Sequence, residues 1–527
     1  MAAGALPQAT RGGFFADFAQ PLTGPRLAVL LGVFAAVWLG LLWSTTNVAP
    51  SDNLEQLAWL GALEWGYYKH PPLPTWLIGA AAALFGVSEG LSYIVGAACT
   101  LSALALFWRL MRALRGPAYA SLALLAALCI TFYTGRLYYY NHNVVMMLWL
   151  VLCASLTWRL TQRPSLGQWL ALGVVIGLGM LTKYQMVIAV VCVALWGLRM
   201  RWWANPVRRR GVLLAAVAGL LVFAPHLNWL IEHDWLPLRY AEQSSIGAAM
   251  PLARRPLHAL AWVGDWLFNR TLPAWLLLLA ASWWAMRRAP QAEAAARQSA
   301  SATDRQVRDF LLIWGVVPLL FMTTMGLLGG VHLQMQWGTA FMLWTVPAVM
   351  EWTRRGAVWT SPATLRAAWS VFVLVQAALL LQYWMASPSG MPGFKAHHFN
   401  HFPADRLAKS IAGAARAELD GPIDIISGTY DVAQAVALRL PERPRVLIFG
   451  ETRYSPWISP DELATARIIE VFPARELPPG AQWATAGWAW RVGVSEQSKL
   501  KVIDWLRMRR ESPGEHGQKQ RAEGAPG

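Results

Sequence analysis

The feature that most constrains this chain is a series of long apolar runs that have no polar face. Runs such as Leu27–Trp43 and Val212–Phe223 show neither the alternation of a half-buried strand nor a narrow helical stripe. A helix that is apolar on all sides belongs in a lipid bilayer. The composition agrees, because 56% of the 527 residues are hydrophobic and only 14% are charged. The sequence therefore predicts an α-helical polytopic membrane protein.

About eleven transmembrane helices are expected, because about 20 residues cross a 30 Å hydrocarbon core. The candidate spans lie near residues 26–46, 91–112, 117–135, 143–161, 166–182, 184–199, 211–231, 271–287, 309–328, 333–352 and 366–385. The first run is too long for the apolar region of a signal peptide and has no obvious cleavage site, so we interpret it as an uncleaved span. The run Leu73–Gly86 is short and follows Pro71-Pro72, so we expect a helix at the outer interface rather than a twelfth span.

The formal net charge of +16 comes from arginines that cluster between the apolar runs. These clusters contain Arg109, Arg112 and Arg115; Arg199, Arg201 and Arg208–Arg210; Arg287 and Arg288; and Arg354, Arg355 and Arg366. Short cytoplasmic loops collect such charges, so the pattern argues against nucleic-acid binding and for contact with membrane lipids. It predicts a cytoplasmic N-terminus, residues 1–25, a transmembrane domain, 26–385, and outer loops at 47–90 and 232–270.

Residues 386–510 differ from the preceding chain, because charged residues become common and short β-branched runs alternate with helical stretches. This pattern predicts a small α/β domain on the outer side of the membrane, followed by a disordered tail at 511–527. His397, His398 and His401 lie close together before this domain. They allow a zinc site, but an interfacial linker is the simpler interpretation.

The first outer loop, 47–90, contains the most informative polar residues. Ser51 is expected to cap a short helix with Asp52 in its first turn, where the helix dipole favours a carboxylate. Glu55 follows three residues later, so it shares a helix face with Asp52. Tyr68, Lys69 and His70 then precede Pro71-Pro72. The loop thus gathers acidic and basic groups at the mouth of the predicted bundle.

The run from Asp52 to Leu73 resembles the first-loop signature of the GT-C glycosyltransferases, in the group of the protein O-mannosyltransferases and aminoarabinose lipid A transferases (family 39). Later stretches also resemble this group, namely Leu181-Thr182-Lys183-Tyr184, Pro225-His226-Leu227-Asn228-Trp229, Pro237-Leu238-Arg239-Tyr240-Ala241 and Ser455-Pro456-Trp457. The resemblance covers most of the chain in order. It implies a GT-C type fold with the active site in the first outer loop.

The resemblance also implies an inverting transfer of a sugar from a polyprenyl-phosphate donor to a lipid or glycan acceptor. Asp52 matches the general base of the group, and Glu55 is either its partner or a simple loop charge. A lipid phosphate leaves with negative charge, so cationic and hydrogen-bonding side chains would hold it. The candidates for substrate and phosphate binding are Tyr68, Lys69, His70, Lys183, Arg239, Tyr240 and His332.

Three positions depart from the pattern of the group. Asn53 stands where the acidic pair usually has Glu, and Asn141-His142-Asn143 stands where an Asp is often found. Gln336 precedes Trp337 where relatives often have His. These departures put a metal contact in doubt, so no cofactor is predicted with certainty and a divalent cation stays possible. We expect His142 to cap the fourth span.

The predicted function is that of a multi-pass glycosyltransferase of the bacterial inner membrane, with its C-terminal domain in the periplasm. The acceptor can be lipid A, another glycolipid, a polysaccharide or a protein. Two alternatives stay open: a flippase or transporter for lipid-linked sugars, and an inactive partner in envelope assembly. A transporter would need polar groups at mid-membrane depth, whereas the polar residues here gather in outer loops.

Overall fold

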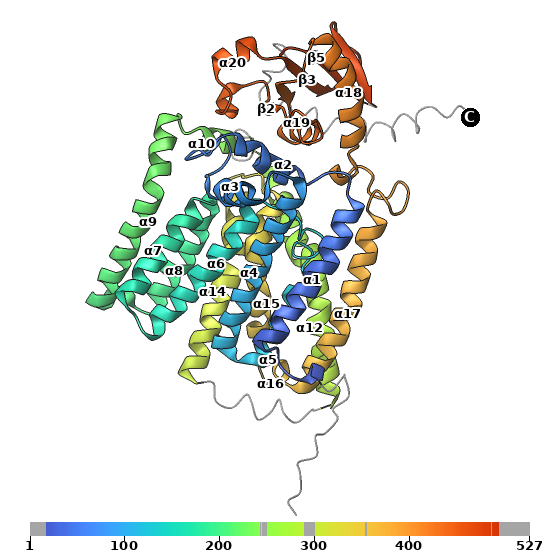
Figure 1. The fold of residues 1–527 in the computed structure, drawn as a ribbon. Helices are drawn as coiled ribbons and strands as arrows, with labels where there is room; N and C mark the ends of the chain where they lie inside the picture. The colour runs from blue at the N-terminus through green and yellow to red at the C-terminus, as the bar shows by residue number, and fades with distance from the viewer. Residues whose placement is uncertain are drawn as a thin grey trace, which may run out of the picture.

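The computed structural model describes residues 17–242, 244, 250–288, 301–353, 356–485 and 487–494. It consists of a bundle of long helices with a small α/β domain seated over one end (Figure 1). We call the end that carries this domain the outer end, and the opposite end the inner end. The predicted disordered tail at 511–527 and most of the predicted N-terminal segment lie outside the described residues.

Six helices of the described chain are long and apolar enough to cross a membrane. These are α1 (Gly24–Thr45), α4 (Glu89–Arg115), α6 (His142–Gln162), α9 (Pro206–Glu232), α14 (Ala302–Leu327) and α17 (Pro362–Met385). Shorter helices complete the bundle, namely α5 (Pro117–Ala127), α7 (Leu166–Met180), α8 (Val187–Arg199), α12 (Leu272–Arg288), α15 (Thr339–Trp352) and α16 (Gly356–Trp359). The predicted α-helical polytopic architecture is confirmed.

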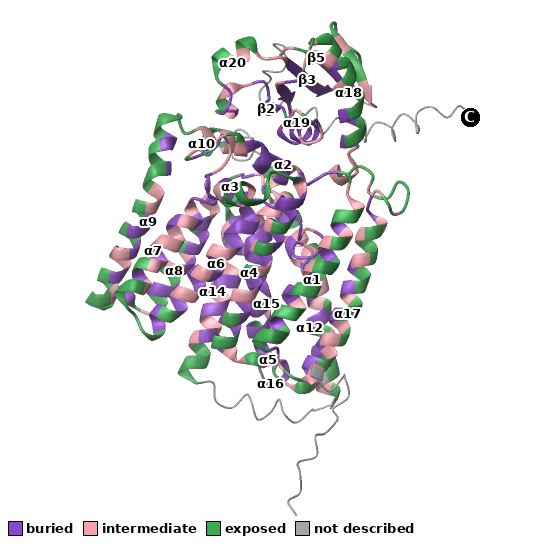
Figure 2. Ribbon diagram, in the orientation of Figure 1, coloured by how far each residue is buried: buried purple, intermediate pink, exposed green. Residues whose placement is uncertain are grey.

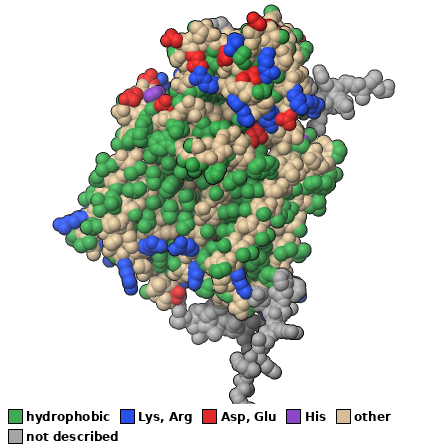
Figure 3. Space-filling view, in the orientation of Figure 1, with side chains coloured by type: hydrophobic (Ala, Val, Ile, Leu, Met, Phe, Trp, Pro, Cys, Tyr) green, Lys and Arg blue, Asp and Glu red, His purple; other side chains and the backbone are tan. Residues whose placement is uncertain are grey.

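The bundle has a hydrophobic flank and a basic inner end. Figure 3 shows hydrophobic side chains covering the flank, with Lys and Arg side chains gathered at the inner end. One of these arginines, Arg115, joins three helices there, because its guanidinium donates to Glu351 at 2.7 Å and to Asp304 at 2.9 Å. Hydrophobic side chains on the flank suit contact with lipid tails.

Two predicted spans are wrong in part. The span at 117–135 is helical only as far as Ala127, and residues 128–138 form turns. The span at 333–352 begins only at Thr339, after a short 3₁₀ turn, η8 (Met335–Gly338). Both irregular segments lie toward the outer end, where they line a cavity. Non-helical backbone at this depth is tolerated when it borders a polar cavity, which a hydropathy count does not detect.

Several short elements cover the outer end of the bundle. They are α2 (Ser51–Ala58), η2 (Trp59–Gly61), α3 (Leu73–Phe85), α10 (Leu236–Ala241), α11 (Arg255–Gly264) and the π-helical turn η7 (Asp265–Arg270). The remaining turns are η1 (Asp17–Ala19), η3 (Tyr184–Met186), η4 (Trp202–Ala204), η6 (Leu252–Arg254), η9 (Phe399–His401) and η10 (Thr452–Tyr454). The run predicted as an interfacial helix is α3, which lies at the outer end crosswise to the long helices (Figure 1).

The C-terminal domain contains a five-stranded sheet with the order β2-β1-β3-β5-β4. Its elements are α18 (Ala404–Glu418), β1 (Ile425–Gly428), α19 (Tyr430–Ala437), β2 (Arg445–Ile448), α20 (Pro460–Thr465), β3 (Ile468–Pro473), β4 (Ala481–Thr485) and β5 (Trp488–Val492). The strand β1 pairs in parallel with β2 and β3, while β5 runs antiparallel to β3 and β4. The predicted small C-terminal α/β unit is therefore present.

The α/β domain docks directly on α2. Helix α19 packs against α2, and α2 is buried over most of its length between the two domains (Figure 2). Gly61, just after α2, leaves no room for a side chain, because a Cβ there would come within 2.5 Å of the Trp457 ring. The first outer loop is thus enclosed between the bundle and the C-terminal domain.

Candidate functional site

Asp52 lies in the first turn of α2, partly exposed, beside the N-terminus of α6. The expectation that Ser51 caps α2 is wrong, because α2 begins at Ser51 and follows Pro50 without a side-chain cap. The carboxylate accepts a hydrogen bond at Oδ2 from Asn141 Nδ2 at 2.9 Å. An unsatisfied helix N-terminus favours a negative charge in this turn. One oxygen of the Asp52 side chain is therefore fixed by Asn141.

Asn141 is itself rigidly placed. Its Oδ1 accepts hydrogen bonds from the backbone N–H groups of Asn143 and Val144 at 3.0 and 3.1 Å. The cap of α6 is thus Asn141, and the expectation that His142 caps this span is wrong. An amide can accept at one atom and donate at the other, so Asn141 caps α6 and orients Asp52 at once.

Asn53, the first departure from the family pattern, is buried and forms structural hydrogen bonds through its side-chain amide. Its Nδ2 donates to Ser92 Oγ and to the Tyr138 carbonyl, both at 2.8 Å, and its Oδ1 accepts from Tyr140 N–H at 2.8 Å. A carboxylate cannot donate these hydrogen bonds. The amide therefore joins α2 to α4 and to the irregular segment before α6.

Glu55 forms a buried ion pair with Lys69. Lys69 Nζ lies 3.0 Å from Glu55 Oε2, and Tyr68 Oη donates to Glu55 Oε1 at 2.9 Å. Burial raises the pKa of Glu55, and the positive charge of Lys69 opposes this shift. Burial lowers the pKa of Lys69, but Glu55, together with Tyr430, Tyr240 and Asp52, outweighs this effect and raises the pKa above its usual value. Lys69 is thus a charged partner of Glu55.

Lys183 approaches Asp52 from the turn between α7 and η3. It is buried, its Nζ donates to Asn143 Oδ1 at 2.6 Å, and it lies 5.7 Å from the Trp337 ring centre. Burial lowers the pKa of Lys183 to about 7, while Asp52 acts in the opposite direction. Its charge therefore changes near neutral pH.

His70 and Tyr240 complete this group of side chains. The ring of His70 lies 4.0 Å from that of His142, and burial together with nearby cations lowers the pKa of His70. Tyr240 packs edge-on against Tyr68, with ring centres 5.5 Å apart. The structure therefore brings Asp52, Glu55, Tyr68, Lys69, His70, Lys183 and Tyr240 together.

Arg239 and His332 have other neighbours. Arg239 is well exposed on α10 and faces Asp234 at 3.8 Å. The ring of His332 lies 4.5 Å from that of His258 on α11. Neither residue lines the cavity beside Asp52.

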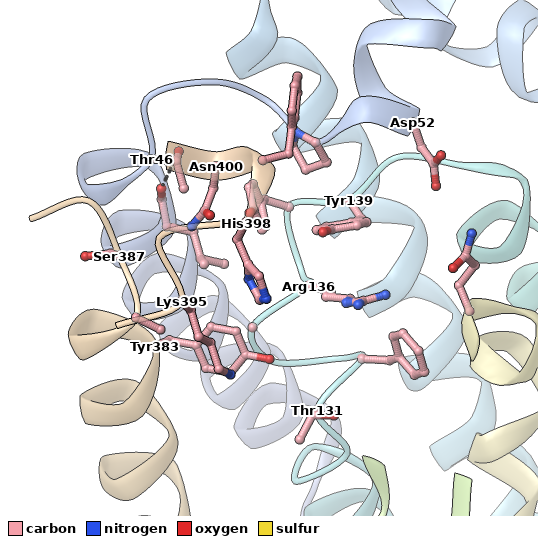
Figure 4. Close-up of a pocket in the computed structure, with 18 of the residues that line it drawn as sticks. Thr46, Asp52, Thr131, Arg136, Tyr139, Tyr383, Ser387, Lys395, His398 and Asn400 are labelled. Carbon is pink, nitrogen blue, oxygen red and sulfur yellow. Dashed lines mark hydrogen bonds between the residues drawn. The ribbon is translucent and has the colours of Figure 1, made fainter. Parts of the chain in front are cut away.

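A cavity of about 600 Å³ opens next to Asp52. The ends of α1 and α17, the start of α2, the irregular segments before α6 and α15, and the linker near residue 400 form its walls. Three cations line it, namely Arg136, Arg270 and Lys395. In Figure 4, Asp52 and Arg136 lie on one side of this space, and Lys395 and His398 lie on the other.

Arg136 and Arg270 flank the same aromatic ring. Their guanidinium carbons lie 4.7 and 4.9 Å from the Phe132 ring centre, and Arg270 also pairs with Asp265 at 3.1 Å. Sequence reasoning missed both residues. A signal was present, because the predicted topology places both arginines outside, against the charge bias that the other clusters follow.

The histidines of the linker do not assemble a metal site. His397 and His398 line the cavity, while His401 Nε2 lies 2.9 Å from the Ala386 carbonyl. Within the described part of the chain, no three His, Cys, Asp or Glu side chains come together to hold a metal ion. These histidines thus belong to the wall of the cavity.

The fold and the site together define a polytopic membrane protein with a carboxylate beside a cationic cavity at the mouth of its bundle. Residues 69–229 match the sequence model of the family described as dolichyl-phosphate-mannose-protein mannosyltransferase. The fold is similar to that of ArnT from Cupriavidus metallidurans bound to undecaprenyl phosphate, with a TM-score of 0.53 and 15% identity. This match covers 91% of the present chain and 100% of the other.

Two curated bacterial proteins are also similar. The lipid A galacturonosyltransferase RgtD of Rhizobium johnstonii is 25% identical over 193 residues, which are 36% of this chain and 40% of that protein. The undecaprenyl phosphate-alpha-4-amino-4-deoxy-L-arabinose arabinosyl transferase of Erwinia tasmaniensis is 26% identical over 334 residues, 56% of this chain and 54% of that protein. The chain thus spans about half or less of the curated relatives it matches. The predicted resemblance to the GT-C glycosyltransferases of the aminoarabinose and lipid A transferase-like group is confirmed.

Proposed function

We propose that this chain transfers a sugar from a polyprenyl-phosphate lipid to a lipid or glycan acceptor at the periplasmic face of the bacterial inner membrane. The observation that carries the proposal is the position of Asp52, whose side chain lines the same cavity as Arg136 and Arg270. A base beside cations suits a reaction in which a hydroxyl attacks and a phosphate leaves. The names of the relatives support lipid-linked sugar and lipid A as substrate classes.

In the proposed reaction, the acceptor hydroxyl gives its proton to Asp52 while its oxygen attacks C1 of the donor sugar. The bond between C1 and the phosphate oxygen breaks, and its electron pair leaves with the polyprenyl phosphate. Attack from the face opposite the phosphate inverts C1. Asn141 holds Oδ2 of Asp52 at 2.9 Å, which leaves Oδ1 to receive the proton.

Cationic side chains stabilise the leaving phosphate in this proposal. Arg136 and Arg270 present planar guanidinium groups, which bind phosphate oxygens in pairs, and Lys183 supplies a charge close to Asp52. Tyr68, His70, Tyr240, Arg239 and His332 do not line this cavity, and in the proposal they contact parts of the substrate that extend beyond it. Glu55 and Lys69 are positioning residues in this proposal, because their ion pair joins α2 to the segment before Pro71.

The residues beside Asp52 do not suggest a resident metal ion. Asp52 accepts a hydrogen bond from the side-chain amide of Asn141, whereas divalent cations such as Mg²⁺ and Ca²⁺ prefer clustered carboxylates. No step of the proposal therefore passes through a metal.

The proposed topology has eleven crossings and a cytoplasmic N-terminus. The six long helices and the shorter helices α5, α7, α8, α12 and α15 cross, while α3 lies at the outer interface. This arrangement places every described arginine of the clusters in the cytoplasm, as the charge bias requires. The α/β domain then lies in the periplasm.

Replacing Asp52 tests the proposal. We expect Asp52→Asn to lower transfer at least 1,000-fold, roughly the effect of losing a general base, with donor binding largely unchanged. The measurements are release of polyprenyl phosphate and formation of glycosylated acceptor by the purified full chain in lipid nanodiscs.

The matched control is Glu64→Gln, which changes another acidic side chain of the same loop. Activity of Asp52→Asn within a few-fold of the unaltered protein would refute the proposed base. A flippase would move the donor without releasing polyprenyl phosphate, and an inactive assembly partner would do neither.

A further inference from the structure

A second cavity of about 460 Å³ lies on the other side of α2, between the helical bundle and the α/β domain. The bundle contributes apolar side chains, including Leu57, Leu60 and Val87, and the α/β domain contributes Leu438 and Trp457. Asp52 and the cations of the first cavity are not among its lining residues. This cavity is therefore separate from the site described above.

The cavity lies next to surfaces that suit the outer membrane interface. Val87 follows α3, whose last residues, Leu84 and Phe85, are 79% and 78% exposed. Exposed hydrophobic side chains of this size at the end of an interfacial helix suit insertion into lipid. The cavity thus lies between the residue that follows α3 and the α/β domain.

Two arginines, Arg443 and Arg445, line the same cavity. Arg445 is committed to protein partners, because it pairs with Glu462 and donates to the Trp457 carbonyl at 2.8 Å. The acidic neighbour of Arg443, Glu442, is committed as well, since it pairs with Arg416 at 2.8 Å. Within the described chain, Arg443 has no ion pair.

The backbone at Arg443 is unusual. Its φ of 50° lies in the left-handed region, which costs a residue other than Gly or Asn about 1 kcal/mol or more, and Pro444 follows it. Such strain persists where the surrounding structure fixes it, often at ligand-binding positions. The loop therefore fixes the backbone of Arg443, which lines the cavity and has no ion pair among the described residues.

We propose that this cavity binds an anionic phospholipid of the outer leaflet, with one acyl chain among Leu57, Leu60 and Leu438 and the phosphate on Arg443. Charge complementarity supports this occupant, because Arg443 lines the cavity and, among the described residues, has no acidic partner that would compete with a phosphate. An apolar cavity lined by one arginine that is not committed to an ion pair among the described residues matches a lipid with one anionic head. The proposal does not depend on the glycosyltransferase activity.

Native mass spectrometry of the full chain released from nanodiscs tests this site. We expect phosphatidylglycerol to remain bound about fivefold more often than phosphatidylcholine, the effect of roughly one favourable arginine contact at a membrane surface. Arg443→Asn should abolish this preference, because Asn tolerates the left-handed backbone but has no charge. Leu438→Trp should reduce retention of both lipids by filling the cavity.

Two controls make the result decisive. Arg443→Lys keeps the charge and should keep the preference, and Lys409→Asn removes an exposed cation of the same domain that does not line the cavity. Equal retention of the two lipids, or a preference that survives Arg443→Asn, would overturn the proposal. Asp52→Asn should lose transfer but keep the lipid preference. The lipid site and the proposed function can therefore be refuted separately.

Discussion

At the scale of single residues, the charge of Lys183 links the site to pH. Lys183 is buried beside Asp52 and Asn143, and its pKa is lowered to about 7. It is therefore mostly protonated below pH 7 and mostly neutral above it. A donor phosphate would favour the protonated form, because an opposite charge raises the pKa of a buried amine.

Donor binding should consequently weaken as the pH rises. If only protonated Lys183 holds the phosphate, the donor Kd should increase about tenfold between pH 6 and pH 8, since about a tenth of the side chains stay charged one unit above the pKa. Lys183→Arg keeps its charge over this range and should flatten the profile. Titration with a fluorescent polyprenyl-phosphate analogue measures the Kd of the unaltered protein and of Lys183→Arg at each pH. Identical pH profiles of the two proteins would exclude Lys183 from phosphate binding.

The sequence predicted the part of the site that is continuous in the chain. Asp52, Glu55, Tyr68 and Lys69 fall within one loop, so their proximity follows from connectivity. The partner of Asp52, Asn141, is 89 residues away, and Arg136 directly follows a predicted span, 84 residues after Asp52. Contacts of this kind depend on tertiary packing, which residue types alone do not specify.

At the scale of elements, short helices make the reaction cavity possible. The helix α5 has 11 residues and α15 has 14, so at 1.5 Å per residue neither covers the hydrocarbon core alone. The irregular segments that continue them carry Arg136 and Gln336, which line the cavity. A count of apolar residues extends both helices into these segments, because it does not detect where the backbone stops being helical.

Arg439, just after α19, connects the α/β domain to the start of the first outer loop. Its guanidinium donates to Glu89 Oε1 at 2.7 Å, to the Asn47 carbonyl at 2.9 Å and to Asp405. Glu89 Oε2 in turn accepts from the Ala49 N–H at 3.2 Å. The backbone three to five residues before Asp52 is thus held by one arginine of the other domain.

Arg439 should act as a positioning residue for Asp52. We expect Arg439→Ala to lower kcat about tenfold with little change in the donor KM, because misplacing a base raises the barrier of the chemical step more than it weakens binding. Arg439→Lys should recover part of the loss. Steady-state kinetics with polyprenyl-phosphate release as the readout separates the two parameters.

Arg416→Ala is the control for this experiment, since it removes a comparable ion pair, with Glu442, inside the α/β domain. An equal loss in both alanine variants would mean that stability of the domain, rather than the position of the loop, limits the rate. A rise in KM at constant kcat would assign Arg439 to substrate binding instead.

At the scale of the whole molecule, charge and domain position define opposite ends. The described arginines of the inner end lie opposite the α/β domain (Figures 1 and 3). The sequence predicted this polarity because the bilayer requires apolar spans and the cytoplasmic loops collect cations. It did not predict that the α/β domain seats on α2, because that contact depends on the shapes of Gly61 and Trp457 rather than on polarity.

The orientation of these ends decides whether the proposed chemistry occurs in the periplasm. Single cysteines at Gln162 and Lys409 report on it, because both positions are exposed, one at the inner end of α6 and one on the α/β domain. A membrane-impermeant maleimide added to intact spheroplasts should label Lys409→Cys fully and Gln162→Cys only after permeabilisation. The unsubstituted chain is the control, since Cys129, Cys153 and Cys192 are buried and Cys99 is partly so. The reverse pattern would place Asp52 and its cavity in the cytoplasm, where a periplasmic acceptor could not reach them, and the proposed transfer would fail with the topology.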